Sequence, residues 1–345
     1  MRSGLFVFRR FDEVRRSMST SSAVPSDGSP GRSCPVRYRY RPEAFAAARA
    51  VPVETAYVIG GLYGNPEALR AVLDMKRREE DHTGRAVTLV FNGDFNWFDV
   101  DADDFAGINT AVLEHLALQG NVEAELDGDE GGCGCNYPEH ISQDVVDRSN
   151  TIMRRLQGTA KSFPELVRRL SALPMHLTLE VGGERVGVVH GDATSLSGWG
   201  FAAEAMAVPQ ASQEIESWFD RAGVLAFCSS HTGLPVLQRF RAAGRDRYVI
   251  NNGAAGLPNF RGARYGLATR VSKWPAHPGQ VLYGAQCEGF HLDALPVRYD
   301  HDAWLQRFAR AWPPGSPAAE SYAARLADGP DLLPEQAQRL SNGAA

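Results

Sequence analysis

The sequence predicts a layered α/β fold, and two observations carry that prediction. From about residue 41 onward, short β-rich runs alternate with stretches of helical periodicity. The chain also has 345 residues and 43% hydrophobic content, which is enough for a large buried core. Strands that alternate with helices form a sheet covered by helices rather than a helical bundle. We therefore expect one large α/β domain or two small ones.

Residues 1–40 are predicted to be a disordered N-terminal extension. Residues 19–35 are rich in Ser, Pro and Gly and offer almost nothing to bury. The residues before them mix basic and apolar side chains, but Asp12 and Glu13 interrupt the pattern and no small-residue cleavage site follows. A disordered extension or an early start codon fits this segment, with a targeting peptide as the alternative.

The folded domain is expected to span residues 41–300. Residues 56–59, AYVI, read as a strand. Asn65 and Pro66 then start a helix, as its N-cap and its first residue. Residues 86–91, AVTLVF, read as a second buried strand that ends in a polar loop.

Further helices are predicted in the middle and at the end of the chain. The apolar stripe of one helix, which ends at Gly120, consists of Ile108, Val112, Leu113 and Leu116. A helical insert is predicted over residues 141–171, where it could form a cap over a cleft. Seven strands follow, in the runs HLTLEV, RVGVVH, VLAFCS, PVLQRF, RYVINN, VLYGAQ and GFHLDALPV. Residues 301–345 are expected to be C-terminal helices and a tail.

Charge and composition limit the partners. The formal charge of -5 and the pI near 6.0 argue against nucleic-acid and membrane partners, because surplus Lys and Arg hold both. A small anionic substrate stays possible, since one local cation reverses the field inside a cleft. No apolar run approaches the roughly 18 residues that span a bilayer. Five widely spread cysteines predict a cytoplasmic protein rather than a disulfide framework, and nothing indicates the oligomeric state.

Cys133 and Cys135 stand apart from the other cysteines, because only one residue separates them in GGCGCNYPEH. Thiolates so close together can share a metal or form a redox couple. The alternative is a Gly-rich surface loop with two incidental thiols. Together with His140, the pair could also build a metal site of soft ligands, which favours zinc or iron.

Polar residues collect where the predicted strands end. The loops there read GGLYGN, NGDFNW, QGNVEAE, HGD, SSHTGLP and NNGAAGLP, of which the third follows the predicted helix that ends near Gly120. In open α/β sheets, ligands bind outside the carboxyl ends of the strands. These six loops are therefore the expected site.

The order and spacing of the six loops resemble those of the calcineurin-like metallophosphoesterase superfamily. In that superfamily the loops read approximately GDxHGN, GDxxxxG, GNH(D/E), a strand ending in His-Gly, GHTHxP and NPGSxGxP. The resemblance spans about residues 53–300 of this chain. It implies a four-layer α/β/β/α sandwich of two mixed sheets flanked by helices.

The resemblance also separates two metal positions. One set of ligand positions is complete, with Asp94, Asn121, His190 and His231. The other set would consist of Gly61, Tyr63, Asp94 and Gly233, so three of its four ligands are lost. The resemblance therefore implies a single divalent metal. Two oxygens and two imidazoles suit Mn²⁺, Fe²⁺, Zn²⁺ or Ni²⁺.

Two further residues are candidate catalytic groups. Where the superfamily has a proton-donating His, this chain has Val122, but the acidic residue after it survives as Glu123. Tyr63 could donate its hydroxyl to a substrate oxygen, coordinate a ferric ion, or fill the space that the lost metal left. Asp192 is predicted to fix the tautomer of an imidazole.

Other charged groups near the loops are predicted to be less involved. His115 is expected to be a packed histidine of the core or the surface. Arg261 and Arg264 could bind a substrate anion, although ordinary solvated arginines are the default expectation.

The implied function is the metal-dependent hydrolysis of a small phosphorylated compound, a phosphomonoester or a phosphodiester. Asp94, Asn121, His190 and His231 would hold the cation that binds the phosphoryl group. Two alternatives stay open, because much of the usual catalytic set is missing. One is a catalytically weak or inactive protein that binds or senses a ligand, and the other is an enzyme with changed chemistry.

Overall fold

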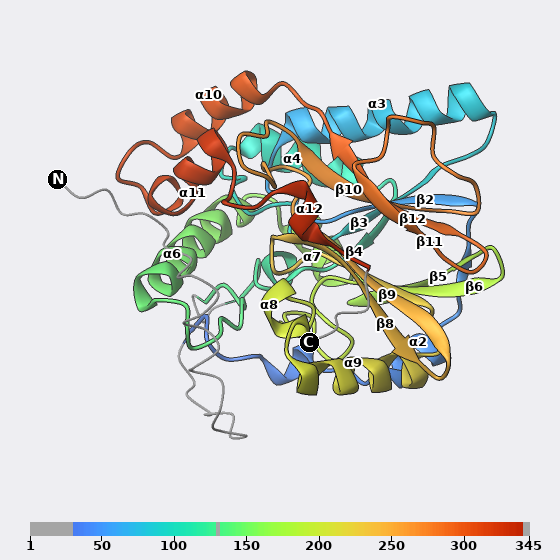
Figure 1. Cartoon of the computed structure of the whole chain (residues 1–345). Helices are drawn as coiled ribbons and strands as arrows, with labels where there is room; N and C mark the ends of the chain where they lie inside the picture. The colour runs from blue at the N-terminus through green and yellow to red at the C-terminus, as the bar shows by residue number, and fades with distance from the viewer. Residues whose placement is uncertain (1–29, 129–131, 341–345) are drawn as a thin grey trace.

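Two β-sheets pack face to face between two layers of helices in the computed structural model, which describes residues 30–128 and 132–340 (Figure 1). One sheet has six strands in the order β11-β12-β10-β2-β3-β4, and the other has seven in the order β1-β5-β6-β7-β9-β8-β13. The predicted four-layer sandwich of two mixed sheets flanked by helices is confirmed.

The six-stranded sheet contains a parallel half and an antiparallel half. Its strands are β2 (Thr55–Ile59), β3 (Thr88–Asn92), β4 (Leu116–Leu118), β10 (Gly266–Ser272), β11 (Tyr283–Gln286) and β12 (His291–Val297). β2, β3 and β4 are parallel neighbours, whereas β10 runs antiparallel to both β2 and β12. The carboxyl ends of β2, β3 and β4 therefore lie at the same edge.

The seven-stranded sheet has a similar parallel centre. Its strands are β1 (Val51–Pro52), β5 (His176–Val181), β6 (Glu184–Val189), β7 (Ala226–Ser229), β8 (Pro235–Ala242), β9 (Arg245–Asn252) and β13 (Gln338–Arg339). β6, β7 and β9 are parallel to one another, and β5 and β8 flank them as antiparallel strands. The loops after β6, β7 and β9 consequently leave the sheet at one edge.

Most of the helices in the described residues lie outside the two sheets, while α12 (Pro334–Ala337) packs against the central apolar cluster through Ala337. The others are η1 (Val36–Tyr38), α2 (Glu43–Ala47), α3 (Pro66–Thr83), α4 (Ala102–Val112), α5 (Asn121–Ala124), α6 (Gln143–Ala160), α7 (Pro164–Ser171), α8 (Ala203–Met206), α9 (Pro209–Ala222), α10 (His301–Ala311) and α11 (Pro317–Asp328). In Figure 1, α3 and α10 lie beyond the six-stranded sheet, and α2 and α9 lie beyond the seven-stranded sheet.

Three apolar clusters separate the four layers. Val58 and Val90 of one sheet pack with Val188 and Ile250 of the other in the central cluster. The other two clusters lie between each sheet and its helices. Burial of apolar area in these three clusters provides the main driving force for folding.

Local sequence signals place α3 as predicted. The side chain of Asn65 accepts hydrogen bonds from the backbone N–H groups of Glu67 and Ala68, both at 3.0 Å, and Pro66 is the first helical residue. The helix ends at Thr83, and the following Gly84 has a φ of 67°, the left-handed conformation that glycine adopts without steric cost. This helix start fixes the loop that leaves β2.

The predicted helix from Ile108 to Gly120 is wrong in its second half. α4 ends at Val112, and Leu116–Leu118 form the edge strand β4, parallel to Val90–Asn92 of β3. Apolar residues at helical spacing continue to Leu116, but pairing with β3 overrides that weak local preference. Asn121 therefore follows a strand and not a helix.

The predicted insert, residues 141–171, consists of two helices, α6 and α7, with Pro164 as the first residue of α7. α6 contacts α4 and α11, and Arg148 donates a hydrogen bond to the Ser321 hydroxyl of α11 at 2.8 Å. The insert is thus packed into the layer of helices.

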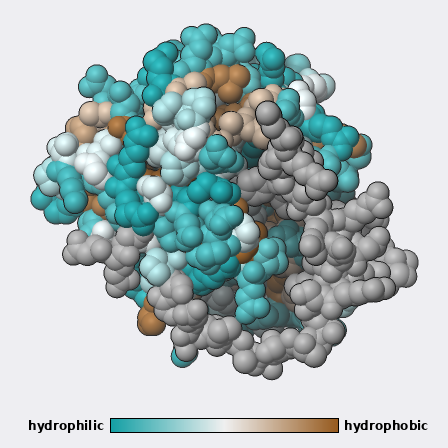
Figure 2. Space-filling view, turned by 90° about the vertical axis from the view of Figure 1, so that its left-hand side faces the viewer, coloured by the Kyte–Doolittle hydropathy of each residue, from teal (hydrophilic) through white to brown (hydrophobic). Residues whose placement is uncertain are grey.

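Most of the predicted disordered extension, residues 1–29, lies outside the described residues. The rest of it is packed on the fold, because Tyr38 is only 1% exposed and its hydroxyl donates to the Glu125 carboxylate. The face shown in Figure 2 is mainly hydrophilic, with hydrophobic residues in small patches. None of the helices within the described ranges is long and apolar enough to cross a membrane.

Candidate metal centre

Four loops bring Asp94, Asn121, His190 and His231 together. Asp94 follows β3, Asn121 is the first residue of α5 after β4, His190 directly follows β6, and His231 follows β7. β3 and β4 are parallel, as are β6 and β7, so the loops of each pair leave the same sheet edge. The two edges meet where the Asn92 side chain of β3 donates to the Val189 carbonyl of β6, at 2.8 Å.

The ligand atoms surround one point. Nε2 of His190 lies 3.3 Å from Oδ1 of Asp94, 3.2 Å from Oδ1 of Asn121 and 3.1 Å from Nδ1 of His231. Ligand atoms of Asp94, His190 and His231 all lie within 4.8 Å of one another. Two atoms that each bind a metal at about 2.1 Å are about 3 Å apart when they bind at right angles. The spacing of the side chains therefore fits a single cation.

Each imidazole is held by its far nitrogen. Nδ1 of His190 lies 3.1 Å from the Asn92 carbonyl and 3.0 Å from the Ser230 hydroxyl, which itself donates to that carbonyl at 2.8 Å. Nε2 of His231 lies 3.0 Å from the Cys135 carbonyl. A carbonyl accepts a hydrogen bond from the ring N–H, so in the neutral ring the nitrogen that faces the centre carries the free lone pair that a metal requires.

The prediction that Asp192 fixes an imidazole tautomer is wrong. Its carboxylate accepts hydrogen bonds from its own loop instead, from the Thr194 backbone N–H and hydroxyl, both at 2.8 Å, and from the N–H groups of Ser195 and Gly200. Backbone carbonyl oxygens orient both histidines. Every residue has such a carbonyl, so the sequence cannot indicate which ones do this.

Burial and the neighbouring charges shift the pKa values of Asp94, His190 and His231 in different directions. Burial opposes ionisation of Asp94, but His190 beside it lowers the pKa of the Asp94 carboxyl overall. Burial likewise opposes the charged form of His190, while the Asp94 carboxylate outweighs burial and raises the pKa of His190. Burial and the neighbouring His190 lower the pKa of His231 to about 3, so His231 is neutral near pH 7.

Backbone geometry brings Asp94 to the centre. Asp94 has a φ of 54°, an uncommon conformation for a residue with a side chain. A Cβ atom at Gly120 would overlap the Asp94 carboxylate, so glycine is required there. The Val122 N–H donates to Oδ1 of Asp94 at 3.2 Å, which orients the carboxylate.

Glu123 supports this loop and does not face the centre. Its carboxylate accepts from the backbone N–H groups of Asp94 at 2.8 Å, Phe95 at 3.1 Å and Gly120 at 2.9 Å, and from the Asn96 side chain at 3.1 Å. Both carboxylate oxygens are thereby occupied. We therefore describe Glu123 as a positioning residue, in place of the catalytic role expected for it.

The Cys133–Cys135 loop is part of the centre and not a surface loop. Cys133 is 0% and Cys135 is 6% exposed, and a disulfide joins them. The Cys133 carbonyl accepts from Nδ2 of Asn121 at 2.8 Å, which turns the amide oxygen toward His190, and the Cys135 carbonyl faces His231. The expectation of two incidental surface thiols is therefore wrong, because both cysteines are buried and bonded to each other. Within the described ranges, the grouped potential metal ligands are Asp94, His190 and His231, so the predicted metal site of Cys133, Cys135 and His140 is not formed.

An aromatic ring lies between Gly61 and Gly233, two positions to which the resemblance assigns the second set of ligands. A Cβ atom at Gly61 would lie 3.2 Å from the Tyr63 ring, and one at Gly233 would lie 3.6 Å from its hydroxyl. Tyr63 is 7% exposed, so the ring fills the space between these two glycines. The structure does not place Tyr63 among the four grouped side chains.

Three other predicted groups lie apart from the centre. Arg261 and Arg264 form exposed ion pairs with Asp331 and Asp302. His115 is half-buried against Phe91, with 5.9 Å between ring centroids. All three fit their default expectations.

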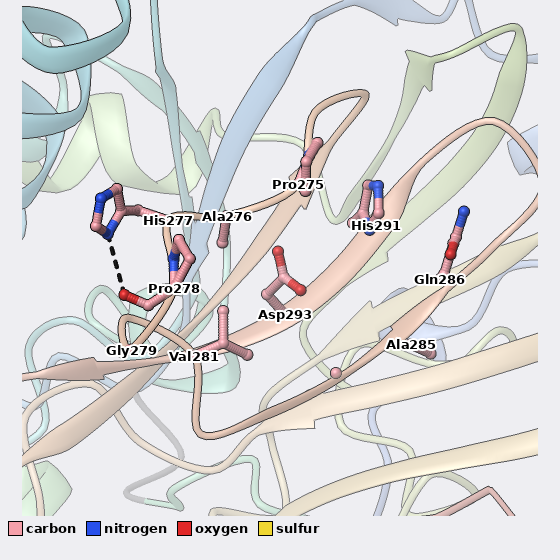
Figure 3. A pocket seen from close by; sticks show the side chains of 11 residues that line it. Pro275, Ala276, His277, Pro278, Gly279, Val281, Ala285, Gln286, His291 and Asp293 are labelled. Atoms are coloured by element: carbon pink, nitrogen blue, oxygen red, sulfur yellow. Dashed lines mark hydrogen bonds between the residues drawn. The ribbon is translucent and has the colours of Figure 1, made fainter.

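A pocket of about 350 Å³ lies beside β11 and β12 (Figure 3). Pro275, His277, Val281, His291 and Asp293 are among its lining residues, and none of the four grouped side chains is. Asp293 already accepts a hydrogen bond from the Arg270 guanidinium at 2.9 Å. This pocket is therefore separate from the candidate centre.

Comparisons with known proteins bear on the fold. No protein-family model and no curated protein matches the chain. A hypothetical protein from Pyrococcus horikoshii is similar with a TM-score of 0.53 and 13% identity, over 81% of this chain and 99% of that one. A metallophosphoesterase from Sphaerobacter thermophilus is similar with a TM-score of 0.50 and 17% identity, over 80% of this chain and 100% of that one. The chain therefore has the fold of this metallophosphoesterase.

Proposed function

We propose that this protein is a metal-dependent hydrolase of a small phosphorylated compound, a phosphomonoester or a phosphodiester, with one divalent cation. The observation that carries the proposal is the convergence of Asp94, Asn121, His190 and His231. The facing atoms of the other three residues lie 3.1–3.3 Å from Nε2 of His190. The donor set of two oxygens and two imidazoles suits Mn²⁺, Fe²⁺, Zn²⁺ or Ni²⁺.

The four side chains would hold the cation and leave part of its coordination sphere to solvent or substrate. When bound, the cation supplies a Lewis acid that polarises a phosphoryl oxygen. Asp94 provides the negative charge that attracts a cation, while His190 and His231 provide lone pairs that their carbonyl partners orient. The Cys133–Cys135 loop keeps the amide oxygen of Asn121 directed at the same point.

The candidate centre offers few groups that could protonate a leaving group. Val122 is apolar and 1% exposed, and both oxygens of Glu123 are occupied by backbone and amide donors. General acid catalysis contributes typically 10²–10⁴-fold to a rate. We therefore expect the fastest turnover with substrates whose leaving groups need no proton, such as aryl phosphates.

The test is a hydrolysis assay with a panel of alkyl and aryl phosphomonoesters and phosphodiesters. Wild-type protein is compared with His231→Ala, which loses a ligand, and with Arg264→Gln, which changes an exposed arginine paired with Asp302. Turnover by wild type and Arg264→Gln, but not by His231→Ala, supports the proposal. Equal turnover by all three proteins contradicts it.

The second candidate function is a protein that binds or senses a ligand without turnover. It is favoured by the Tyr63 ring, which lies between Gly61 and Gly233 where the other ligands would be. Protein that holds one metal and hydrolyses no member of the panel would select this function.

A further inference from the structure

A cationic side chain approaches the same space as Tyr63. Arg325 of α11 donates from Nη2 to the Gly233 carbonyl at 2.7 Å and from Nε to the Pro258 carbonyl at 3.1 Å. A longer bond of 3.4 Å joins Nη2 to the Asn259 side chain. These neutral acceptors hold the guanidinium beside the loop that carries His231.

The remaining nitrogen of Arg325 is without a hydrogen-bond partner among the residues that the structure describes. Nη1 makes no hydrogen bond to any residue in the described ranges, and no carboxylate there lies within 4.0 Å of the guanidinium. The side chain is only partly exposed, and burial lowers its pKa, but a guanidinium stays protonated in proteins. A partly buried cation without a counter-ion is costly, and an anion that paired with it would offset that cost.

The Tyr63 hydroxyl is a second donor at this place that has no partner in the described ranges. It forms no hydrogen bond within the part of the chain that the structure describes, and burial raises its pKa, so it keeps its proton. The position of a Cβ atom at Gly233 is 3.5 Å from Nη1 of Arg325 and 3.6 Å from Oη of Tyr63. Two donors, one of them charged, therefore lie near one point without a partner in the described part of the chain.

The backbone indicates that the position of Tyr63 is imposed. Its φ of 56° is uncommon for a residue other than glycine, and its N–H donates to the Asp94 carbonyl at 3.1 Å. Such outliers concentrate at functional sites, where the surroundings hold them. The same hydrogen bond joins the loop of Tyr63 to the loop of the candidate metal centre.

We propose that Arg325 and Tyr63 form an oxyanion-binding site next to Asp94 and His231. A phosphoryl group could then contact the cation on one side and the two organic donors on the other. The assignment of the anion as the phosphoryl group of a substrate rests on the proposed function. The site itself rests only on the two unpaired donors and their convergence.

The experiment measures binding of inorganic phosphate to the purified protein by isothermal titration calorimetry, with the metal content determined in parallel. Hydrogen bonds to charged groups support a loss of about 10-fold or more in affinity for Arg325→Gln. Tyr63→Phe keeps the ring and should lose about 2- to 10-fold, as for a neutral hydrogen bond. The matched control is Arg264→Gln, which should bind phosphate like wild type. Metal content should be unchanged in all three variants.

Arg325 also donates hydrogen bonds to three loop acceptors, so its replacement by Gln could disturb the fold. Arg325→Lys is a second variant that separates this effect from the loss of anion binding. It keeps the charge but not the planar fork, so its affinity should fall between those of wild type and Arg325→Gln. Phosphate affinity within twofold of wild type in both Arg325 variants would overturn the proposal. Arg325-dependent phosphate binding without turnover of any ester would leave this site standing and would contradict the proposed hydrolase function alone.

Discussion

Nε2 of His190 and Nδ1 of His231 face each other at 3.1 Å, and each ring is hydrogen-bonded to a backbone carbonyl through its other nitrogen. Two lone pairs so close together repel unless a proton or a cation lies between them. The Asp94 carboxylate, 3.3 Å from the same His190 nitrogen, adds negative charge. The pair is therefore arranged for a cation.

Added metal should stabilise the folded protein. A ligand that binds only the native state adds about 2.7 kcal/mol at 100 times its Kd. We expect Mn²⁺ or Zn²⁺ to raise the Tm of chelator-treated protein by several degrees, as measured by differential scanning calorimetry. His231→Ala should show no such rise, and an equal rise in that variant would place the metal elsewhere.

Opening the disulfide should weaken metal binding. The Cys133 carbonyl accepts a hydrogen bond from the Asn121 amide, and the Cys135 carbonyl faces Nε2 of His231. A looser loop would therefore misorient two of the four side chains. Loss of such outer partners typically costs about 10- to 100-fold in metal affinity. Metal titrations should show this loss in the Cys133→Ser, Cys135→Ser double variant.

The control for the disulfide variant is Cys34→Ser, which changes a free, half-buried cysteine. It should bind metal like wild type. Unchanged metal affinity in the double variant would show that Asn121 and His231 hold their orientation without the disulfide.

Arg270 should contribute strongly to stability. It is 2% exposed in β10, and its guanidinium pairs with Glu79 of α3 and Asp293 of β12, both at 2.9 Å. Removing one partner of a buried ion pair costs about 3–5 kcal/mol, because the other charges stay buried. Urea unfolding of Arg270→Leu should show this loss. Arg264→Leu, at an exposed pair, should change stability by less than about 0.5 kcal/mol, and equal losses would contradict the account.

The same arginine explains why sequence reasoning missed β10. All residues of β10, Gly266–Ser272, are buried. Its sequence nevertheless begins with a glycine, and Arg270 interrupts its apolar residues. An Arg inside a short run reads as a surface loop unless its acidic partners are known, and Glu79 and Asp293 are far away in the sequence. One of the two central strands of the six-stranded sheet therefore lacked a clear local signal.

Local signals did identify other parts of the fold. Asn65 and Pro66 predicted the start of α3, because an N-cap and a first-turn proline act within four residues. Leu116 misled for the opposite reason, since β4 exists only through its pairing with β3. Elements that depend on tertiary pairing are the ones that a single sequence predicts least well.

The candidate centre follows the same division. Asp94, Asn121, His190 and His231 could be proposed from their motifs, and the structure brings them together. The groups that orient them could not, because Cys133 and Cys135 act through backbone carbonyls. Arg325 was missed as well, since it lies far along the chain in α11 and belongs to no motif.

The most direct test of the central claim is elemental analysis of protein purified without chelator and without a metal-binding tag. We predict one divalent metal per chain in wild type and in Tyr63→Phe, and loss of that metal in Asp94→Ala, His190→Ala and His231→Ala. Two metals per chain in wild type, or a full metal complement in His231→Ala, would contradict the single-cation centre.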